Sequence, residues 1–333
     1  MQTQRLFPIT EASQTAEARR AISELARTLG FNETDTGKVA LVVTEAATNL
    51  LKHAKQGQLI VRAIERAGIP GLELLALDRG PGITNVNKAL QDGYSTTGSS
   101  GTGLGAMMRL AAEFDLYSQV GGGTALLTRF WLKPLPAAIT EGVQVGVVSL
   151  PKAGEQVCGD QWAVQPQRDR CLLVVADGLG HGPEAAKAAQ AAVQTLAMPT
   201  ALPPTALMED AHRALRSTRG AAVALVELQW PQQLVRFVGI GNISALVLDG
   251  ANRRHLVSHN GIVGHEMRKL QEFTTPWNDG ALLILHSDGL ATHWNLTDYA
   301  GLTTHDPSLI AGVLYRDFTR GRDDVTVVVV KQA

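Results

Sequence analysis

Three polar side chains recur at steps of four along the otherwise apolar stretch TEAATNLLKHA, residues 44–54. Residues four apart on an α-helix lie on one face, so we expect Glu45, Asn49 and His53 to form one polar line. A carboxylate can serve as a general base, and an amide oxygen suits a hard cation such as Mg²⁺. A solvated stripe on an amphipathic helix has the same pattern, so the decision between site and surface depends on other motifs.

A second motif follows a predicted strand. Asp78 ends the apolar stretch LELLAL and is followed by Gly80 and Gly82. A carboxylate at a strand end can accept a hydrogen bond from an exocyclic amine, and glycines let the backbone approach a flat ring. A plain Asp-Gly turn is the alternative interpretation.

A glycine-rich loop then leads into a helix. Gly101, Gly103 and Gly105 stand where the free N–H groups and positive end of that helix would meet an anion such as a polyphosphate. The loop has no Gly-Lys-Ser/Thr ending, which excludes a P-loop, and it has neither the GxGxxG spacing nor the position directly after a strand of a Rossmann loop. The loop alone does not identify the ligand.

Four aspartates in the second half stand beside predicted strands: Asp177 and Asp288 end apolar stretches, Asp323 precedes one together with Asp324, and Asp160 follows a glycine. Each alone fits a turn. Carboxylates at the ends of core strands are costly to bury unpaired, so the set predicts compensating cations. All-oxygen ligation favours Mg²⁺ or Mn²⁺ over zinc, and two such ions can activate a water toward a phosphoester.

The order of elements predicts two domains. In the first half, helices at 11–29, 34–54 and 104–113 and strands at 58–65 and 71–77, followed by two more strands, indicate a mixed sheet with helices on one face. The stretch 131–142 holds two prolines and predicts a linker, with the boundary near residue 138. We therefore expect domains over 1–136 and 137–333.

The second half is dominated by strands. Strands at 143–149, 160–165 and 171–176 precede helices at 183–197 and 204–216, and nearly continuous Val, Ile and Leu runs follow. Such runs indicate strands covered on both faces, and hence stacked sheets with outer helices.

Composition narrows the class of protein. The 333 residues are 45% hydrophobic and 18% charged, with a formal net charge of −1. This balance lacks the cationic excess that drives binding to nucleic acid or acidic membranes. Cys158 and Cys171 have no metal-binding spacing and are expected to be reduced thiols. No apolar run is long enough to span a bilayer, so a cytoplasmic location is expected.

The motifs of the first half, over about residues 10–133, resemble the GHKL ATPase superfamily and within it the RsbT-type switch kinases. That resemblance implies a Bergerat α/β sandwich that binds ATP and Mg²⁺ and phosphorylates serine or threonine on STAS-domain proteins. It implies that Glu45 is the catalytic base, that Asn49 holds Mg²⁺ and that Asp78 accepts from the adenine amine. The remaining nucleotide-binding positions would be Gly80, Gly82, Gly101, Gly103, Gly105 and Thr124, with residues 84–105 as a lid.

Residues 143–331 resemble the SpoIIE-like branch of the PPM-type serine/threonine phosphatases, and the stretch SLPKAGEQVCGDQWAV is similar to the RsbX type. The resemblance implies an α-β-β-α sandwich in which Asp177 is catalytic and bridges two metal ions. Gly178 would contribute its carbonyl, Asp288 and Asp323 would hold one metal, and Asp160 would lie on the other side of the site. No further acid follows Asp160 three residues later, so the number of metals beyond two stays open.

We therefore predict an α+β, two-domain bacterial signalling enzyme that uses ATP with Mg²⁺ and a Mg²⁺ or Mn²⁺ phosphatase site. Its expected partners are STAS-domain substrates, with a sigma factor or a downstream signalling enzyme as a further partner, and a homodimer is consistent with the family. Two alternatives stay open: the first domain binds nucleotide and partners without transferring phosphate, or the second is a degenerate scaffold. Asn242 and His181 are expected to be structural, and Lys152 is a candidate phosphate contact.

Overall fold

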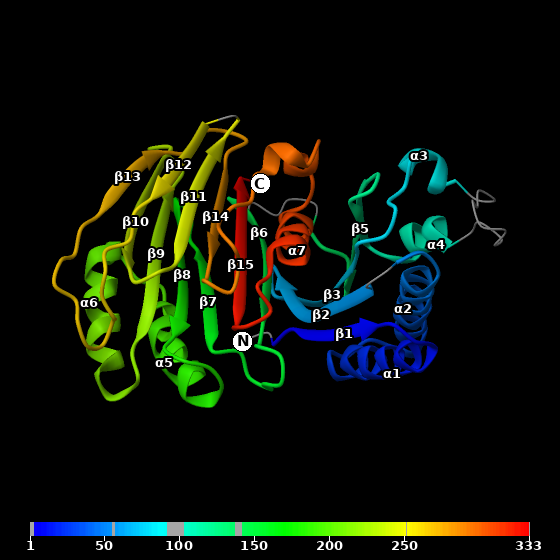
Figure 1. Cartoon of the computed structure of the whole chain (residues 1–333), viewed down its shortest axis with the longest axis horizontal. Coiled ribbons are helices and arrows are strands. Elements are labelled where there is room, and N and C mark those ends of the chain that lie inside the picture. Colours follow the sequence, from blue (N-terminus) through cyan, green and yellow to red (C-terminus); the bar gives the residue numbers. More distant parts are fainter. Residues whose placement is uncertain (1–2, 55–56, 92–102, 137–141, 251, 333) are drawn as a thin grey trace. The chain divides into compact units, whose positions relative to one another are not determined.

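The computed structural model describes residues 3–54, 57–91, 103–136, 142–250 and 252–332. The chain divides into two compact units (Figure 1). The first comprises Met1–Ile139 together with Asp298–Arg316, and the second comprises Thr140–Thr297 together with Asp317–Ala333. The predicted domains, 1–136 and 137–333, are both continuous in sequence. They therefore do not include Asp298–Arg316 in the first unit.

The first unit contains a five-stranded sheet in the order β1-β2-β3-β5-β4. Its strands are β1 (Arg5–Ile9), β2 (Gly57–Arg66), β3 (Ile69–Asp78), β4 (Glu113–Gln119) and β5 (Gly123–Trp131). All neighbouring strands pair antiparallel, so the predicted mixed sheet is wrong. The cause is local: β2 and β3 are joined through Ala67 and Gly68, which both have positive φ, as a tight hairpin turn requires.

Helices α1 (Ala12–Thr28), α2 (Glu33–His53) and α4 (Gly103–Leu110) pack with the sheet in one core, and α3 (Val86–Ala89) is a short turn of helix. The Asn32 side chain caps α2 by accepting from the Asp35 N–H. The apolar side of α2, including Val43 and Ala47, packs in the same cluster as Leu72 and Leu74 of β3. This packing fixes the rotation of α2, so that Glu45 and Asn49 remain partly exposed.

The opposite face of this sheet is covered by helix α7 (Pro307–Phe318). A Cβ on Gly312 would lie 3.1 Å from the Leu77 side chain and 3.6 Å from that of Leu75, both on β3. The helices of the first half share one face of the sheet, as predicted, whereas α7 comes from the second half of the sequence and was not predicted. Every residue from Pro307 to Arg316 is buried, so the sequence lacks the polar stripe by which an amphipathic helix is recognised.

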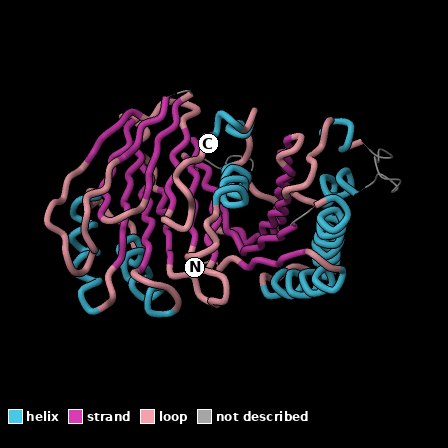
Figure 2. Tube along the Cα trace, in the orientation of Figure 1, coloured by secondary structure: helices cyan, strands magenta, loops and turns pink. Residues whose placement is uncertain are grey.

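The second unit contains two stacked five-stranded sheets, ordered β13-β10-β9-β8-β7 and β12-β11-β14-β15-β6 (Figure 2, strands magenta). Their strands are β6 (Val143–Leu150), β7 (Asp160–Pro166), β8 (Arg170–Gly178), β9 (Ala221–Gln229), β10 (Leu234–Ile240), β11 (Ser244–Asp249), β12 (Asn252–Leu256), β13 (Phe273–Pro276), β14 (Leu282–His286) and β15 (Val325–Gln332). Alternate side chains such as Val175 on β8 and Leu285 on β14 share the core between the sheets.

Helices α5 (Pro183–Val193) and α6 (Pro204–Ala214) cover the outer side of the β8 sheet, with one-turn helices after each at Gln194–Leu196 and Leu215–Ser217. Val174 of β8 packs there with Ala189 and Met208. Because β8 is covered on both faces, its sequence is a continuous apolar run. The predicted stacked sheets with outer helices are confirmed.

Candidate functional site

The polar line of α2 faces the start of α4. A Cβ on Gly103 would lie 2.9 Å from Glu45 Oε2 and 3.9 Å from Asn49 Nδ2, so these two side chains lie directly beside the first residue of α4. The first N–H groups of a helix have no partner within the helix and attract anions. The structure thus brings together Glu45, Asn49 and Gly103, while His53, one turn further on, is exposed.

Asp78 lies at the end of β3 and is fixed by two backbone donors. Its Oδ1 accepts from the N–H of Gly80 at 2.7 Å and from the N–H of Thr124 at 3.2 Å. Burial raises the pKa of the Asp78 carboxyl, and these two hydrogen bonds oppose the shift. Within the described residues, both hydrogen bonds of the side chain go to Oδ1. Oδ2 can therefore accept a hydrogen bond from the amine of a ligand.

Glycines surround Asp78 because the backbone there is crowded. Gly123 has φ +80°, and a Cβ on it would overlap the carbonyl oxygen of Asp78. Gly82 has φ +72°, and a Cβ on it would overlap the carbonyl of Gln119. Both positions therefore require glycine for conformation and for space.

A hydroxyl pair ties these turns together: Thr124 was among the predicted residues, whereas nothing in the sequence indicated Ser118. Ser118 Oγ on β4 accepts from the N–H of Ile83 at 2.8 Å and lies 2.9 Å from Thr124 Oγ1. Of the other predicted residues, Gly105 is buried in α4. Gly101 and half of the predicted lid over residues 84–105 lie outside the described residues.

The acidic residues of the second unit begin with a cross-strand pair. Asp160 on β7 lies directly opposite Asp177 on β8. Asp160 is only 1% exposed. Its Oδ2 accepts from Ser287 Oγ at 2.6 Å, whereas Oδ1 is buried without a hydrogen-bond partner in the described part of the chain. A buried carboxylate oxygen without a partner is costly, and a bound cation would remove that cost.

The remaining aspartates lie close enough to act on this pair. Burial raises the pKa of Asp177 most strongly, and the charges of Asp160, Asp288, Asp323 and Asp324 raise it further. Burial and the charges of Asp324 and Asp288 likewise raise the pKa of Asp160. The four predicted metal ligands therefore share one electrostatic site, and Asp324 belongs to it as well.

These carboxylates do not form a ready-made cage. Over the described residues, no three His, Cys, Asp or Glu side chains lie in a geometry that would hold a metal ion. Asp288 Oδ2 instead accepts from Asn242 Nδ2 at 2.8 Å, and Asp324 Oδ1 accepts from the Lys152 N–H at 2.9 Å. The donor chemistry and the orphaned oxygen of Asp160 fit a hard divalent cation, with side-chain rotation needed to complete its shell.

Three neighbours refine the predicted roles. Gly178 lies against α5, where a Cβ would overlap the Ala185 carbonyl, so no side chain fits there. His181 Nδ1 lies 2.6 Å from Glu155 Oε1, which agrees with the expected loop-bonding role. Asn242 is more than a turn residue because it bonds Asp288 directly. Its only sequence signal was an amide side chain after Gly241, beside a strand end.

Comparisons with known families give two consecutive matches along the chain, and the second includes Asp298–Arg316 of the first unit. Residues 7–130 match the family described as "Histidine kinase-like ATPase domain", and residues 167–332 match the family described as "Stage II sporulation protein E (SpoIIE)". In the described part of the chain, no helix has both the length and the apolar character needed to cross a membrane.

Individual relatives match the two parts separately. Serine/threonine-protein kinase RsbT of Bacillus subtilis (strain 168) is 36% identical over 116 residues, which are 35% of this chain and 87% of RsbT. Phosphoserine phosphatase RsbX of the same organism is 24% identical over 192 residues, which are 56% of this chain and 94% of RsbX.

Two solved structures support the fold. A crystal structure of RsbX in complex with magnesium has a TM-score of 0.50 and 20% identity, and covers 59% of this chain and 98% of RsbX. A structure described as "The bacterial stressosome: a modular system that has been adapted to control secondary messenger signaling" has a TM-score of 0.54 and 29% identity. That match covers 57% of this chain and 99% of the other.

Proposed function

Because the chain belongs to the histidine kinase-like ATPase family through an RsbT-type domain and continues into a SpoIIE-type phosphatase domain, we propose that it sets the phosphorylation of STAS-domain regulators. The second unit removes phosphate from phosphoserine or phosphothreonine. The first unit binds ATP with Mg²⁺ and phosphorylates the same class of partner. The observation that carries the proposal is the cross-strand pair of Asp160 and Asp177, in which Asp160 is buried with one carboxylate oxygen that has no hydrogen-bond partner in the described part of the chain.

The phosphatase site is built to hold cations. Asp177, Asp160, Asp288 and Asp323, with the carbonyl of Gly178, would bind two Mg²⁺ or Mn²⁺ ions. Such ions supply a water of lowered pKa and neutralise charge on the phosphoester. The chain's own contribution is orientation: Ser287 holds one oxygen of Asp160, and Asn242 holds one oxygen of Asp288.

The nucleotide site would recognise adenine through the carboxylate of Asp78. Its Oδ2 would accept from the exocyclic amine while Oδ1 stays bonded to Gly80 and Thr124. Asn49 would supply an amide oxygen for Mg²⁺. Glu45, beside the first turn of α4, takes the proton of the attacking serine or threonine hydroxyl as the γ-phosphoryl group is transferred.

The proposed partners follow from the relatives. RsbT is named a serine/threonine kinase and RsbX a phosphoserine phosphatase, and the stressosome structure concerns a signalling assembly. A chain that joins both kinds of domain is suited to act on one class of regulator in both directions. We therefore take phosphorylated STAS proteins as the substrate to test.

Two assays with one STAS protein test the two activities. The full chain with Mn²⁺ should release phosphate from the phosphorylated STAS protein, and Asp177→Asn should abolish this release. With radiolabelled ATP, the Asp177→Asn chain should label the unphosphorylated protein, and Glu45→Ala in that background should not. Absence of Mn²⁺-dependent release contradicts the phosphatase function.

A binding-only first domain is the competing proposal. It predicts that ATP binds with the same affinity to the wild-type chain and to Glu45→Ala, and that neither labels the STAS protein. The position of Glu45 beside α4 favours transfer, because binding alone does not require a base there.

A further inference from the structure

A segment of the phosphatase sequence is built into the nucleotide-binding unit. Residues Asp298–Arg316, here named the strap, belong to the first unit although they lie in sequence between Asp288 and Asp323. We propose that the strap couples occupancy of the nucleotide site at Asp78 to the geometry of the phosphatase carboxylates Asp288 and Asp323. The proposal rests on the functions assigned above to both sites and adds the means of regulation.

A partly buried ion pair anchors the strap to the sheet. Arg129 Nη1 and Nη2 on β5 donate to Asp306 Oδ2 at 2.7 Å and Oδ1 at 2.8 Å. The two parallel bonds form the bidentate geometry that gives such pairs their strength. Ser308 adds a second link, since its hydroxyl donates to Glu73 Oε2 on β3 at 2.9 Å.

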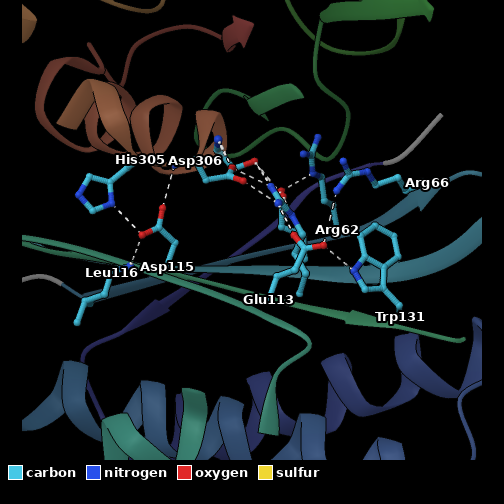
Figure 3. A network of polar contacts seen from close by, with 11 residues as sticks. Arg62, Arg66, Glu113, Asp115, Leu116, Trp131, His305 and Asp306 are labelled. Atoms are coloured by element: carbon cyan, nitrogen blue, oxygen red, sulfur yellow. Dashed lines mark hydrogen bonds and ion pairs between the residues drawn. The ribbon is translucent and has the colours of Figure 1, made fainter. Parts of the chain in front are cut away.

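A second anchor lies on β4. Asp115 Oδ2 accepts from the backbone N–H of Asp306 at 2.9 Å, and its Oδ1 lies 2.8 Å from His305 Nδ1. Figure 3 shows His305 and Asp306 above the sheet, with Asp115 and Glu113 beneath them. Each of these strands therefore contributes a charged residue whose partner is on the strap.

The end of the strap touches the proposed adenine position. Arg316 Nη1 donates to the backbone carbonyl of Asp78 at 3.0 Å, and the Arg79 guanidinium donates in turn to the carbonyl of Arg316. The side chain of Arg316, the last residue of the strap, is thus bonded to the main chain of Asp78, the last residue of β3, and the side chain of the next residue, Arg79, is bonded to the main chain of Arg316. A ligand that shifts or fixes Asp78 acts directly on Arg316.

The chain then carries that constraint to the metal-site carboxylates. After Arg316 the backbone pairs with the segment that follows Asp288: the Ala291 N–H donates to the Phe318 carbonyl at 2.9 Å. The Arg320 N–H donates to the Gly289 carbonyl, also at 2.9 Å. Gly289 directly follows Asp288, and Arg320 precedes Asp323 by three positions. A short backbone clamp within the second unit therefore links the segment after Asp288 to the segment between the strap and Asp323.

The test uses the full chain, with p-nitrophenyl phosphate as substrate and a series of buffered free Mn²⁺ concentrations that are the same with and without nucleotide. We expect saturating ADP to change either the turnover number or the Mn²⁺ half-saturation concentration at least threefold. GDP is the matched control because it carries the same phosphates as ADP. Its ring has a carbonyl oxygen at the position where adenine has the amine that would donate a hydrogen bond to Asp78. GDP at the same concentration should have no such effect.

Variants of the strap separate coupling from binding. Asp306→Asn removes the negative charge that pairs with Arg129, while Arg129 keeps its hydrogen bonds to Glu73 and Glu113. It should retain hydrolysis without nucleotide within twofold and lose more than half of the ADP effect. Glu24→Gln makes the same carboxylate-to-amide change in an exposed pair with Arg27 on α1 and should keep the full effect.

The outcomes distinguish the proposals. If ADP binds in a calorimetric titration but changes neither kinetic constant, the coupling is refuted while both sites stand. If the ADP effect persists in full in both Asp306→Asn and Arg316→Met, the strap is not its route, and the proposal is equally refuted. If no Mn²⁺-dependent hydrolysis occurs with or without ADP, the phosphatase assignment itself fails.

Discussion

Asp160 and Asp177 face each other across two neighbouring antiparallel strands, with Asp160 almost fully buried. Like charges directly opposite in a sheet destabilise it, and burial adds the cost of desolvation. A bound ligand can offset this free-energy cost. Asp177 lies within the residues that match the SpoIIE family, and we propose that the ligand of the pair is a divalent cation.

Replacing Asp78 should weaken adenine nucleotide binding selectively. Asp78→Asn can place an amide N–H₂ group against the adenine amine, where two donors meet. A hydrogen bond to a charged group is worth about 1.5–3 kcal/mol, so we expect roughly a tenfold to hundredfold loss of ATP affinity. Calorimetric titration measures it, with Glu24→Gln as control. An unchanged affinity would remove Asp78 from the site.

Gly123 and Gly68 offer a matched pair of alanine substitutions in one unit. Their φ angles are +80° and +73°, but a Cβ would overlap the Asp78 carbonyl at Gly123 and meet nothing within 4 Å at Gly68. Gly68→Ala should cost only the backbone strain of about 1 kcal/mol. Gly123→Ala should cost more and also weaken ATP binding, because it displaces Asp78. Equal melting temperatures and equal ATP affinities would contradict this account.

The ion pairs that Glu73 forms with Arg62 and Arg129 should be sensitive to acid. Burial alone would raise the pKa of Glu73, but the charges and hydrogen bonds of Arg62 and Arg129 lower it to about 2 from the usual 4.5. A lowered folded-state pKa gives stability that is present above pH 4.5 and is lost as the pH falls toward 2.

Between pH 6 and pH 3, the free energy of unfolding should therefore fall by about 2 kcal/mol more in the wild-type chain than in Glu73→Gln. Urea unfolding at the two pH values measures this difference. If the two proteins lose the same stability on acidification, Glu73 does not carry the charge assigned to it.

Much of the fold was predictable because its elements have a clear period or a clear stop. The polar line and apolar side of α2 located it within one residue at each end, and the unbroken run of β15 marked a strand covered on both faces. Helix α7 was missed for the opposite reason, since burial on all sides removed its polar stripe. The strand pairing was misjudged because two turn residues, Ala67 and Gly68, decided it.

The residue types of the candidate sites were readable, but their partners were not. The carboxylates at strand ends indicated Asp160 and Asp177, yet nothing marked Ser287, which bonds Asp160 from 127 positions away. Likewise, the sequence placed Asp306 in the second domain, whereas its side chain pairs with Arg129 of the first unit. Contacts of this range depend on sheet order, which local patterns do not specify.

Binding of Mn²⁺ to the nucleotide-free chain tests the central claim most directly, and paramagnetic resonance of the free ion reports it. The account predicts two bound Mn²⁺ per wild-type chain and at least tenfold weaker binding in Asp177→Asn. Asp169 is exposed in the turn between β7 and β8, and the Asp169→Asn chain should bind Mn²⁺ as the wild-type chain does. Equal Mn²⁺ binding by the wild-type chain and Asp177→Asn, or no binding to either, would contradict the account.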